Sequence, residues 1–365
     1  MPVRVAHVVG KMVGGGVEAV VMNYYRHIDR SRYQFDILVD ADSARVPHSE
    51  IEELGGRVIK IPPYQHALSY QRDLRELFEA ERWPIVHSHV NAMSVFPLRA
   101  AKEAGVPVRI AHSHSTSGAG EYAKNAIKGL LKPFSSRYAT NRIACSKYAG
   151  EWLFGKGSSF ALLPNAIDTS LFLPSDEVRN KVRDSLGIDQ SSFVVGHIGR
   201  FAKQKNHSFL LEVFSELKKI EPSALLVCAG EGSLLTDTID RAKELGLDGS
   251  VLFLGRYEKA YELYQAFDVF CLPSLYEGLP VVGVECQAAH VPMLASDAMT
   301  SETAFTSLVD FEHLSSSPGV WAEHLLEMRD RQFLPEDEEG VKTFDIAQSS
   351  LQLQNLYDSL LEGVR

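Results

Sequence analysis

The sequence predicts an α/β protein of two doubly wound domains, each built on a parallel sheet. Three observations support this prediction. At 365 residues the chain is long for one hydrophobic core, so two domains are expected. Short apolar strand runs alternate with helical runs in both halves, which is the pattern of parallel sheets. A linker with a short helix, punctuated by Pro174 and Gly187, spans residues 171–189 between the two halves.

Each predicted element has its own pattern. Apolar runs bounded by glycine, proline or polar residues indicate buried strands, and apolar residues three and four apart indicate helices. In the first half these patterns place strands at Val3–Val9, Phe35–Val39, Arg57–Ile61, Pro84–His89, Val108–Ala111 and Ile143–Ser146, and helices at 19–28, Ser69–Glu81, Glu121–Thr140 and Ala149–Phe154. In the second half they place strands ending at Gly199 and covering Ala224–Cys228, Val251–Gly255 and Val269–Leu272, and helices at 207–219, Tyr261–Phe267, Gly319–Met328 and Phe344–Leu361.

Composition and charge exclude several classes of protein. The net charge of −10 argues against a general nucleic-acid-binding protein. No apolar stretch approaches the length of a membrane span, so we expect a cytoplasmic protein. The four cysteines, Cys145, Cys228, Cys271 and Cys286, have no metal-like spacing. Three of them lie in apolar runs typical of reduced core residues.

The most informative stretch is Leu272–Asp297, where a strand end, a turn rich in glycine and proline, and an apolar helix follow one another. Pro280 suits the helix start, where free N–H groups and the helix dipole can bind a phosphate. Glu277 before that start and Glu285 inside the helix could both face one ligand at the end of the strand. Taken singly, either glutamate could be a solvated surface group. Glu285, however, lies among apolar residues, and a buried carboxylate needs a partner.

A second group of polar residues follows the first strand of the C-terminal half. This strand ends at Gly199 and Arg200, and Lys205 comes five residues later, before the next helix. Two cations beside a helix start suit a diphosphate, although loop arginine and lysine residues are commonly only solvated. Together with the two glutamates, they indicate a site for a phosphorylated ligand.

The N-terminal half contains a weaker phosphate-binding pattern. The loop Lys11–Glu18, which includes Gly15 and Gly16, joins the first strand to a helix. A glycine loop at a helix start can bind a phosphate, but this loop matches neither of the common nucleotide-binding fingerprints. A tight turn that lets the helix pack closely on the strand is the structural alternative.

Two strands of the N-terminal half end in the sequence His-Ser-His, at 87–89 and at 112–114. Histidine pairs at the carboxyl ends of parallel strands indicate a polar pocket. They could also bind a metal, because imidazole is a common transition-metal ligand. No carboxylate accompanies the pairs, so we expect no metal.

One basic region stands out in this acidic chain. Lys124, Lys128 and Lys132 are four residues apart in the predicted helix at 121–140, and Arg137 and Arg142 follow. This stripe could contact an anionic membrane or a lipid-diphosphate acceptor. A solvated helix face would have the same sequence pattern.

The stretch PSLYEGLPVVGVE resembles the signature of retaining glycosyltransferases of family 4, which have the GT-B fold. The stretches NYYRHID, ACSKYAGEWLFG and GRFAKQKNH are similar to bacterial capsular and exopolysaccharide glycosyltransferases. The resemblance implies two Rossmann-like domains facing each other across a cleft, with the C-terminal helix crossing back to the first domain. An acceptor-binding domain would comprise residues 1–170 with about 345–365, and a nucleotide-sugar-binding domain residues 171–344.

The resemblance also implies roles for the residues of the C-terminal half. Glu277 would contact the donor sugar, and Glu285 the ribose hydroxyls of the nucleotide. Arg200 and Lys205, after Gly199, would bind the donor diphosphate. Arg256 would lie in the loop that reads the base. The backbone of Gly278, Leu279 and Pro280 would lie near the sugar and the diphosphate.

In the N-terminal half, the resemblance implies that the loop with Gly15 and Gly16 faces the donor. His114, or alternatively His112, would approach the donor sugar. One departure from the family pattern is His290, which stands where glycine is usual. The resemblance therefore does not predict the conformation of the turn at this position.

We therefore expect a retaining hexosyltransferase that moves a sugar from a nucleotide diphosphate sugar, a UDP-sugar, to a polysaccharide or lipid-linked oligosaccharide in capsule or exopolysaccharide synthesis. It would need no metal or other cofactor, and it would bind no nucleic acid. It would contact the inner face of the cell membrane through the stripe of Lys124, Lys128 and Lys132. Two alternatives remain, a nucleotide-sugar 2-epimerase of the same fold and a catalytically silent nucleotide-sugar-binding protein.

Overall fold

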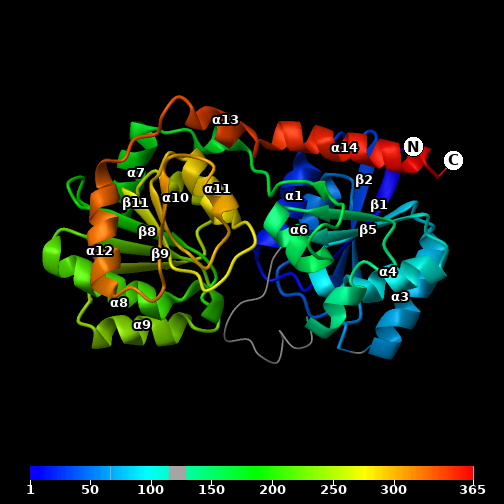
Figure 1. Ribbon diagram of the computed structural model, residues 1–365, viewed down its shortest axis with the longest axis horizontal. Helices are drawn as coiled ribbons and strands as arrows, with labels where there is room; N and C mark the ends of the chain where they lie inside the picture. The colour runs from blue at the N-terminus through cyan, green and yellow to red at the C-terminus, as the bar shows by residue number, and fades with distance from the viewer. Residues whose placement is uncertain (66, 115–128, 365) are drawn as a thin grey trace. The chain divides into compact units, whose positions relative to one another are not determined.

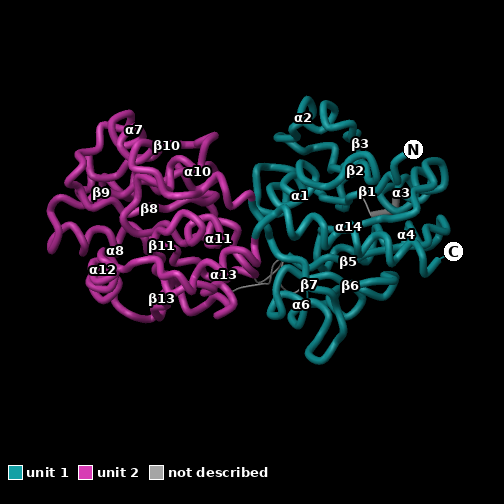
Figure 2. Tube along the Cα trace, turned by 90° about the horizontal axis from the view of Figure 1, so that it is seen from above, with its two compact units in different colours: residues 1–167, 345–365 teal, residues 168–344 magenta. Residues whose placement is uncertain are grey.

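The structure is a computed structural model that describes residues 1–65, 67–114 and 129–364. The chain divides into two compact units, coloured teal and magenta in Figure 2. Unit 1 comprises Met1–Ile167 and Asp345–Arg365, and unit 2 comprises Asp168–Phe344. Each unit is built on one parallel sheet, which confirms the predicted pair of doubly wound domains.

The sheet of unit 1 has the strand order β3-β2-β1-β4-β5-β6-β7. Its strands are β1 (Val3–Gly10), β2 (Tyr33–Asp40), β3 (Arg57–Ile61), β4 (Ile85–Ser88), β5 (Val108–Ser113), β6 (Asn141–Ala144) and β7 (Ala161–Leu162). Parallel neighbours need crossover connections. The helices of this unit are α1 (Gly16–His27), α2 (His48–Glu53), α3 (Ala67–Glu81), η1 (Asn91–Ser94), α4 (Val95–Glu103), η2 (Lys132–Phe134), α6 (Lys147–Phe154) and α14 (Ile346–Glu362).

The sheet of unit 2 has the order β10-β9-β8-β11-β12-β13. Its strands are β8 (Val194–Ile198), β9 (Leu225–Ala229), β10 (Val251–Gly255), β11 (Val269–Leu272), β12 (Met293–Ser296) and β13 (Val309–Glu312). Its helices are η3 (Thr169–Phe172), α7 (Asp176–Leu186), η4 (Lys203–Lys205), α8 (His207–Ile220), α9 (Leu235–Glu244), α10 (Ala260–Tyr264), α11 (Val281–Ala288), η5 (Ser301–Thr303), α12 (Pro318–Glu327), η6 (Met328–Asp330) and α13 (Asp337–Lys342).

Each unit has its own hydrophobic core. In unit 1 the rings of Phe78 and Trp83 meet edge to face, with centroids 5.9 Å apart, within a cluster of buried residues. In unit 2, Phe214 of α8 and Trp321 of α12 belong to one buried cluster with the strands. Burial on both faces of a parallel sheet explains why these strands are continuous apolar runs in the sequence.

The C-terminal helix α14 returns to unit 1, as predicted, and packs beside α1 (Figure 1). Asp358 accepts hydrogen bonds from Arg32 (2.8 Å) and from the Tyr33 hydroxyl (2.7 Å). Tyr357, the preceding residue, is fully buried. The helix is therefore part of the unit 1 core and not an appended segment. Within the described residues, no helix combines the length and apolar character needed to cross a bilayer.

The predicted helix at 121–140 is wrong beyond residue 131. Residues 129–131 are helical, but a 3₁₀ turn follows at Lys132–Phe134 and turns continue to residue 138. Pro133 explains the change, because proline has no N–H to donate and its ring collides with the preceding helical turn. Residues 115–128 lie outside the described residues, and with them Lys124 and Lys128.

His290 follows the C-cap of α11, Ala289, in a left-handed backbone conformation, with φ at +57°. Glycine is favoured at such a position because it has no Cβ to clash. The imidazole of His290 lies flat on the ring of Phe333, with centroids 3.6 Å apart and planes within 4°. This stacking offsets part of the backbone strain and explains how histidine is accommodated where glycine is usual.

We predict that His290→Ala destabilises unit 2 more than His290→Gly does. Alanine keeps the left-handed strain and loses the ring stacking, whereas glycine loses only the stacking. The difference should be roughly 1 kcal/mol in the free energy of unfolding. Urea denaturation of both variants measures it, and equal stability would show that the backbone at this position carries no strain.

Candidate functional site

Both sheets reverse their strand order beside their first strand. The reversal lies between β1 and β4 in unit 1 and between β8 and β11 in unit 2. Open parallel sheets bind ligands at the carboxyl ends of the strands beside such a reversal. The fold thus places the predicted residues after β8 and β11 at one reversal, and the histidines of β1, β4 and β5 at the other.

In unit 2 the structure joins Lys205 and Glu277, which come from two different loops. Nζ of Lys205 lies 2.7 Å from Oε1 of Glu277, and both side chains are largely buried, at 14% and 10% exposure. Gln204 donates to the other carboxylate oxygen over 3.0 Å, and its backbone carbonyl accepts from Leu275 N–H. The loop after β8 and the loop after β11 are therefore linked by several polar contacts.

Close packing of glycines shapes the loop after β8. A Cβ on Gly199 would lie 3.2 Å from Cε of Lys205, so glycine leaves room for the lysine side chain. Gly230 has φ at +142°, and a Cβ there would lie 2.0 Å from the carbonyl oxygen of Gly199. Arg200, which follows Gly199 in the chain, is exposed. The loop thus presents one exposed cation beside a buried one.

Glu285 occupies the second turn of α11, and its carboxylate accepts a hydrogen bond from the Tyr264 hydroxyl over 2.8 Å. Burial raises the pKa of the Glu285 carboxyl, while the Tyr264 hydrogen bond and the charge of Lys205 oppose that rise. Pro280 caps the helix, which begins at Val281, one residue later than predicted. The loop residues before the helix are buried: Gly278, Leu279 and Pro280.

Arg256 is exposed after β10, at the edge of the unit 2 sheet. Two strands, β9 and β8, separate β10 from β11 and the Glu277 loop. The described contacts do not bring Arg256 together with Lys205 or Glu277.

The glycine loop of unit 1 already holds an anionic group of its own. The carboxylate of Glu18, in the first turn of α1, accepts hydrogen bonds from the N–H groups of Val13 (2.8 Å) and Gly14 (2.7 Å). Gly15 caps α1 and Gly16 begins it. Two N–H groups of this loop are thus taken by Glu18, so a phosphate would have to displace that carboxylate from them.

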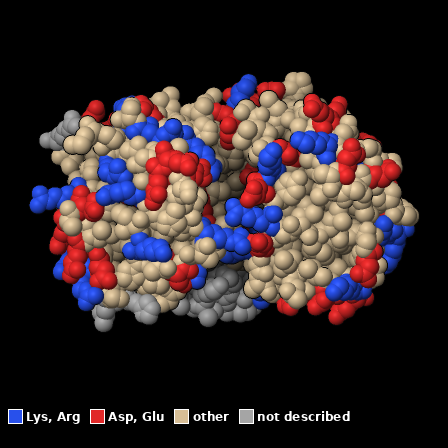
Figure 3. Space-filling view, turned by 180° about the vertical axis from the view of Figure 1, so that it is seen from behind, with Lys and Arg blue, Asp and Glu red and all other residues tan. Residues whose placement is uncertain are grey.

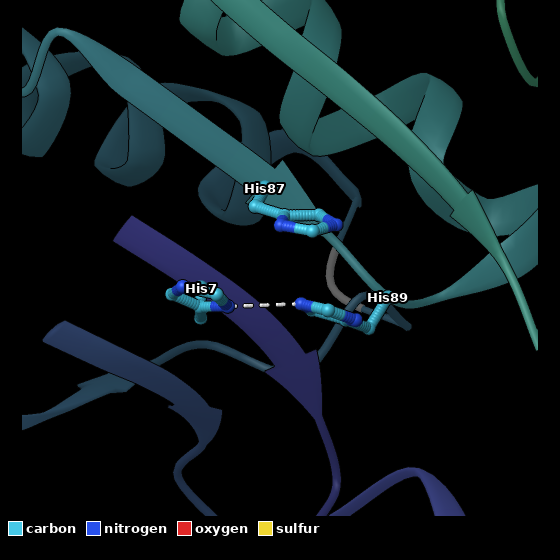
Figure 4. A group of neighbouring side chains, drawn as sticks. All are labelled: His7, His87 and His89. Carbon is cyan, nitrogen blue, oxygen red and sulfur yellow. Dashed lines mark hydrogen bonds between the residues drawn. The ribbon is translucent and has the colours of Figure 1, made fainter. Parts of the chain in front are cut away.

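The carboxyl ends of β1, β4 and β5 hold five buried histidines, namely His7, His87, His89, His112 and His114. Figure 4 shows three of them, with Nδ1 of His7 3.0 Å from Nε2 of His89. His114 contacts His89 (2.8 Å) and the side chain of Asn165 (3.4 Å). His114, at 5% exposure, is the least buried of the five, whereas His112 is at 1%.

Burial sets the charge state of these histidines. It lowers the pKa of His114 to about 4 and the pKa values of the other four well below their usual range, and the neighbouring rings add to the effect for those four. All five imidazoles are therefore neutral at pH 7. Two groups have spacings that a metal ion could use, His7 with His87 and His89, and His89 with His112 and His114.

Sequence reasoning missed Asn165, which contacts His114, and four further residues at these sites. Gln204 and Tyr264 hold the two glutamates of unit 2, and His7 and Tyr357 complete the histidine cluster of unit 1. His7 could have been found, because it lies in a strand that a doubly wound fold places beside β4. The other three carry no local signal.

Charged residues of both signs are mixed on the face of the molecule that Figure 3 shows. On the face shown in Figure 3, acidic and basic side chains alternate without an extended basic area. Lys132 lies 5.0 Å from the ring centroid of Trp152, close to the exposed side chains of Leu130 (72%) and Phe134 (42%) in the sequence. Of the predicted basic residues, the structure describes Lys132, Arg137 and Arg142, and Arg142 lies in β6.

Comparison with known proteins places both units in described families. The family model for glycosyl transferases group 1 matches residues 178–309, and that for the glycosyl transferase 4-like domain matches residues 15–165. EpsF of Bacillus subtilis, provisionally described as a glycosyltransferase, is 39% identical over 331 residues, which is 88% of this chain and 86% of EpsF.

More distant relatives are enzymes of the same kind. The UDP-Gal:α-D-GlcNAc-diphosphoundecaprenol α-1,3-galactosyltransferase of Escherichia coli is 25% identical, covering 81% of this chain and 79% of that protein. The capsular polysaccharide biosynthesis glycosyltransferase CapH of Staphylococcus aureus is 23% identical, covering 98% and 99%. The crystal structure of HepE from Anabaena with UDP-glucose matches with a TM-score of 0.80 at 17% identity, over 98% of this chain and 99% of that one. These matches confirm the GT-B fold, and the three relatives are described as glycosyltransferases and not as epimerases.

We predict a steep loss of stability in mild acid. A histidine that stays neutral when folded but titrates at about 6.5 when unfolded stabilises the protein fully above pH 6.5 and progressively less below it. Between pH 7.5 and 5.5 each such histidine should cost about 1.4 kcal/mol of unfolding free energy. Urea unfolding followed in unit 1 at both pH values measures the loss.

A control separates buried from exposed histidines. His48→Gln, which removes an exposed histidine of the same unit, should leave the pH dependence unchanged. Equal stability of the wild type at the two pH values would contradict the neutral state assigned to the buried cluster.

Proposed function

The chain belongs to the group 1 glycosyltransferases with a 4-like N-terminal domain, and from this premise we propose that it transfers a sugar from a UDP-sugar with retention at the anomeric carbon. The acceptor is a growing polysaccharide or an oligosaccharide on a lipid diphosphate, as in capsule or exopolysaccharide synthesis. Support for the donor comes from HepE, which was crystallised with UDP-glucose, and from the galactosyltransferase of Escherichia coli, whose name specifies UDP-Gal and a diphosphoundecaprenol acceptor. CapH supports the place in polysaccharide synthesis.

One observation carries the proposal, the buried contact of Lys205 with Glu277 beside exposed Arg200 at the strand reversal of unit 2. When the glycosidic bond to the diphosphate breaks, negative charge grows on the leaving phosphate oxygens. Preorganised cations that stabilise such charge supply a large share of catalysis. Lys205 and Arg200 take this role, helped by the N–H groups at the start of α11. A metal ion is then not needed to neutralise the diphosphate.

The remaining predicted residues recognise the rest of the donor. Glu277, held at both carboxylate oxygens by Lys205 and Gln204, contacts the sugar. Glu285, oriented by Tyr264, accepts hydrogen bonds from the ribose hydroxyls. We propose His114 as the histidine that approaches the donor sugar, because it is the least buried of the five, whereas Nε2 of His112 is fully buried.

The proposal is tested by incubating the protein with a panel of radiolabelled UDP-sugars, with and without a membrane extract that supplies lipid-linked acceptors. Transfer to a lipid or saccharide product, with the α-linkage of the donor kept, is the expected result. Binding of UDP without turnover of any sugar would favour a silent binding protein instead.

Within that assay we predict that Lys205→Ala lowers kcat by about 100-fold, the effect of removing one preorganised group from a developing anion. Lys205→Arg keeps the cation and should recover part of the rate. Lys203→Ala, an exposed lysine two residues earlier, is the matched control and should behave like the wild type. Unchanged turnover of Lys205→Ala at saturating donor would remove Lys205 from the mechanism.

We also propose that the region around Lys132 contacts anionic membranes, which brings the enzyme to a lipid-linked acceptor. Lys132 and Arg137 supply positive charge, and Leu130 and Phe134 supply exposed apolar surface. Each basic residue near an anionic surface contributes about 1 kcal/mol. Salt should weaken the attraction by screening it.

We predict that Lys132→Glu/Arg137→Glu reduces co-sedimentation with anionic vesicles by roughly tenfold or more. A control variant, Lys219→Glu/Lys243→Glu, makes the same charge change on unit 2 and should bind as the wild type does. Equal binding of all three proteins, or equal binding to neutral and anionic vesicles, would leave this region as ordinary surface.

A further inference from the structure

Five imidazoles and one phenol of unit 1 form a single chain of hydrogen bonds, here named the histidine relay. It starts at the side-chain oxygen of Asn165, 3.4 Å from Nδ1 of His114. Nε2 of His114 then contacts Nδ1 of His89 (2.8 Å), and Nε2 of His89 contacts Nδ1 of His7 (3.0 Å). The Tyr357 hydroxyl joins Nε2 of His7 (3.5 Å) to Nδ1 of His87 (2.8 Å). The last link runs from Nε2 of His87 to Nδ1 of His112 (3.1 Å). Nε2 of His112, the last atom, is buried and has no hydrogen-bond partner among the described residues.

The rings of the relay are arranged head to tail. Every link leaves one ring at Nε2 and enters the next at Nδ1. A neutral imidazole has one N–H donor and one lone pair, so each link uses the donor of one ring and the lone pair of its neighbour. The Tyr357 hydroxyl can accept from one side and donate to the other. All five histidines must therefore carry their proton on the same nitrogen.

The two ends of the relay decide which nitrogen that is. The oxygen of Asn165 can only accept, so it requires the proton of His114 on Nδ1. With protons on Nδ1 throughout, the far end leaves a lone pair on Nε2 of His112. The opposite order would leave a buried N–H there instead, and orphaned buried N–H groups are rarer in proteins than under-satisfied acceptors.

We propose that Asn165, acting through the histidine relay, holds the proton of His114 on Nδ1 and so makes His114 a hydrogen-bond donor to an oxygen of the donor sugar. Asn165 is then a positioning residue. Its contact with His114 is long, so a sugar hydroxyl oxygen can take its place while the other rings keep the proton order. The relay itself stands on the contacts within unit 1, and only the identity of the ligand rests on the proposed function.

The tautomers can be read from ¹⁵N NMR spectra of protein labelled at histidine, assigned by single histidine substitutions. In the wild type, all five relay histidines should carry the proton on Nδ1. Asn165→Leu removes the acceptor at one end, and His112, at the other end, should change to a mixture of both tautomers. Asn165→Asp keeps an acceptor and should keep the wild-type pattern.

Two further variants show whether the effect travels through the relay. Asn23→Leu removes a hydrogen bond to the neighbouring Ala166 carbonyl without touching the relay, and its histidines should match the wild type. Tyr357→Phe cuts the relay in the middle. In that background, adding Asn165→Leu should no longer change the tautomer of His112. A wild-type His112 with its proton on Nε2, or an unaltered His112 in Asn165→Leu, would overturn the proposal.

Kinetics complete the test. If His114 donates to the sugar, kcat/KM for the donor should fall about tenfold in Asn165→Leu, the value of one hydrogen bond, and less than twofold in Asn165→Asp. Altered tautomers with unchanged kcat/KM would refute the positioning role while leaving the glycosyltransferase function intact. A wild type that transfers no sugar would refute the proposed function, and the spectra would still decide the relay.

Discussion

Polar side chains at the ends of buried parallel strands must find partners inside the fold, and both units are organised by this constraint. An unpaired buried carboxylate, ammonium or imidazole loses the hydrogen bonds that water gave it, at a cost of several kcal/mol for a charge. In unit 2, Glu277 is matched by Lys205 and Gln204, and Glu285 by Tyr264. The polar groups that a ligand would meet are thus already fixed by one another.

The two units meet the constraint in different ways. Unit 2 pairs opposite charges, as in the contact of Lys205 with Glu277. Unit 1 buries five imidazoles with no carboxylate among the contacts described for them, and burial keeps them neutral. A neutral network recognises its partners by the direction of its hydrogen bonds and suits uncharged hydroxyl groups. The carboxylate of Glu18 in the glycine loop adds an internal anion to the same unit.

The C-terminal helix belongs to this polar arrangement as well as to the core. Tyr357 places its hydroxyl between His7 and His87, and Asp358 fixes the same turn of α14 to Arg32 and Tyr33. Helix α14 therefore completes a network at the end of β4, although Tyr357 and His87 are 270 residues apart in the chain. Loss of α14 would leave histidine nitrogens of unit 1 without this hydroxyl.

Local patterns in the sequence predicted the doubly wound fold, and the family resemblance predicted the return of α14. The sequence also placed Lys205 and Glu277 in loops at strand ends, where the structure joins them. Apolar runs, glycine and proline punctuation and a local motif are short-range signals, and parallel topology places the residues after successive strands at one edge. Sequence reasoning failed where a local signal was overlooked and where the deciding contact is distant. Pro133 ended a helix whose charge pattern continued beyond it, and a ring from Phe333 made a left-handed histidine tolerable at position 290. The tertiary structure alone decided the partners Gln204, Tyr264 and Tyr357 and the nitrogen on which each histidine carries its proton. These depend on side chains that meet only after the chain has folded. Hydrogen bonding is set by distance and direction in space, so it leaves no periodicity in the sequence.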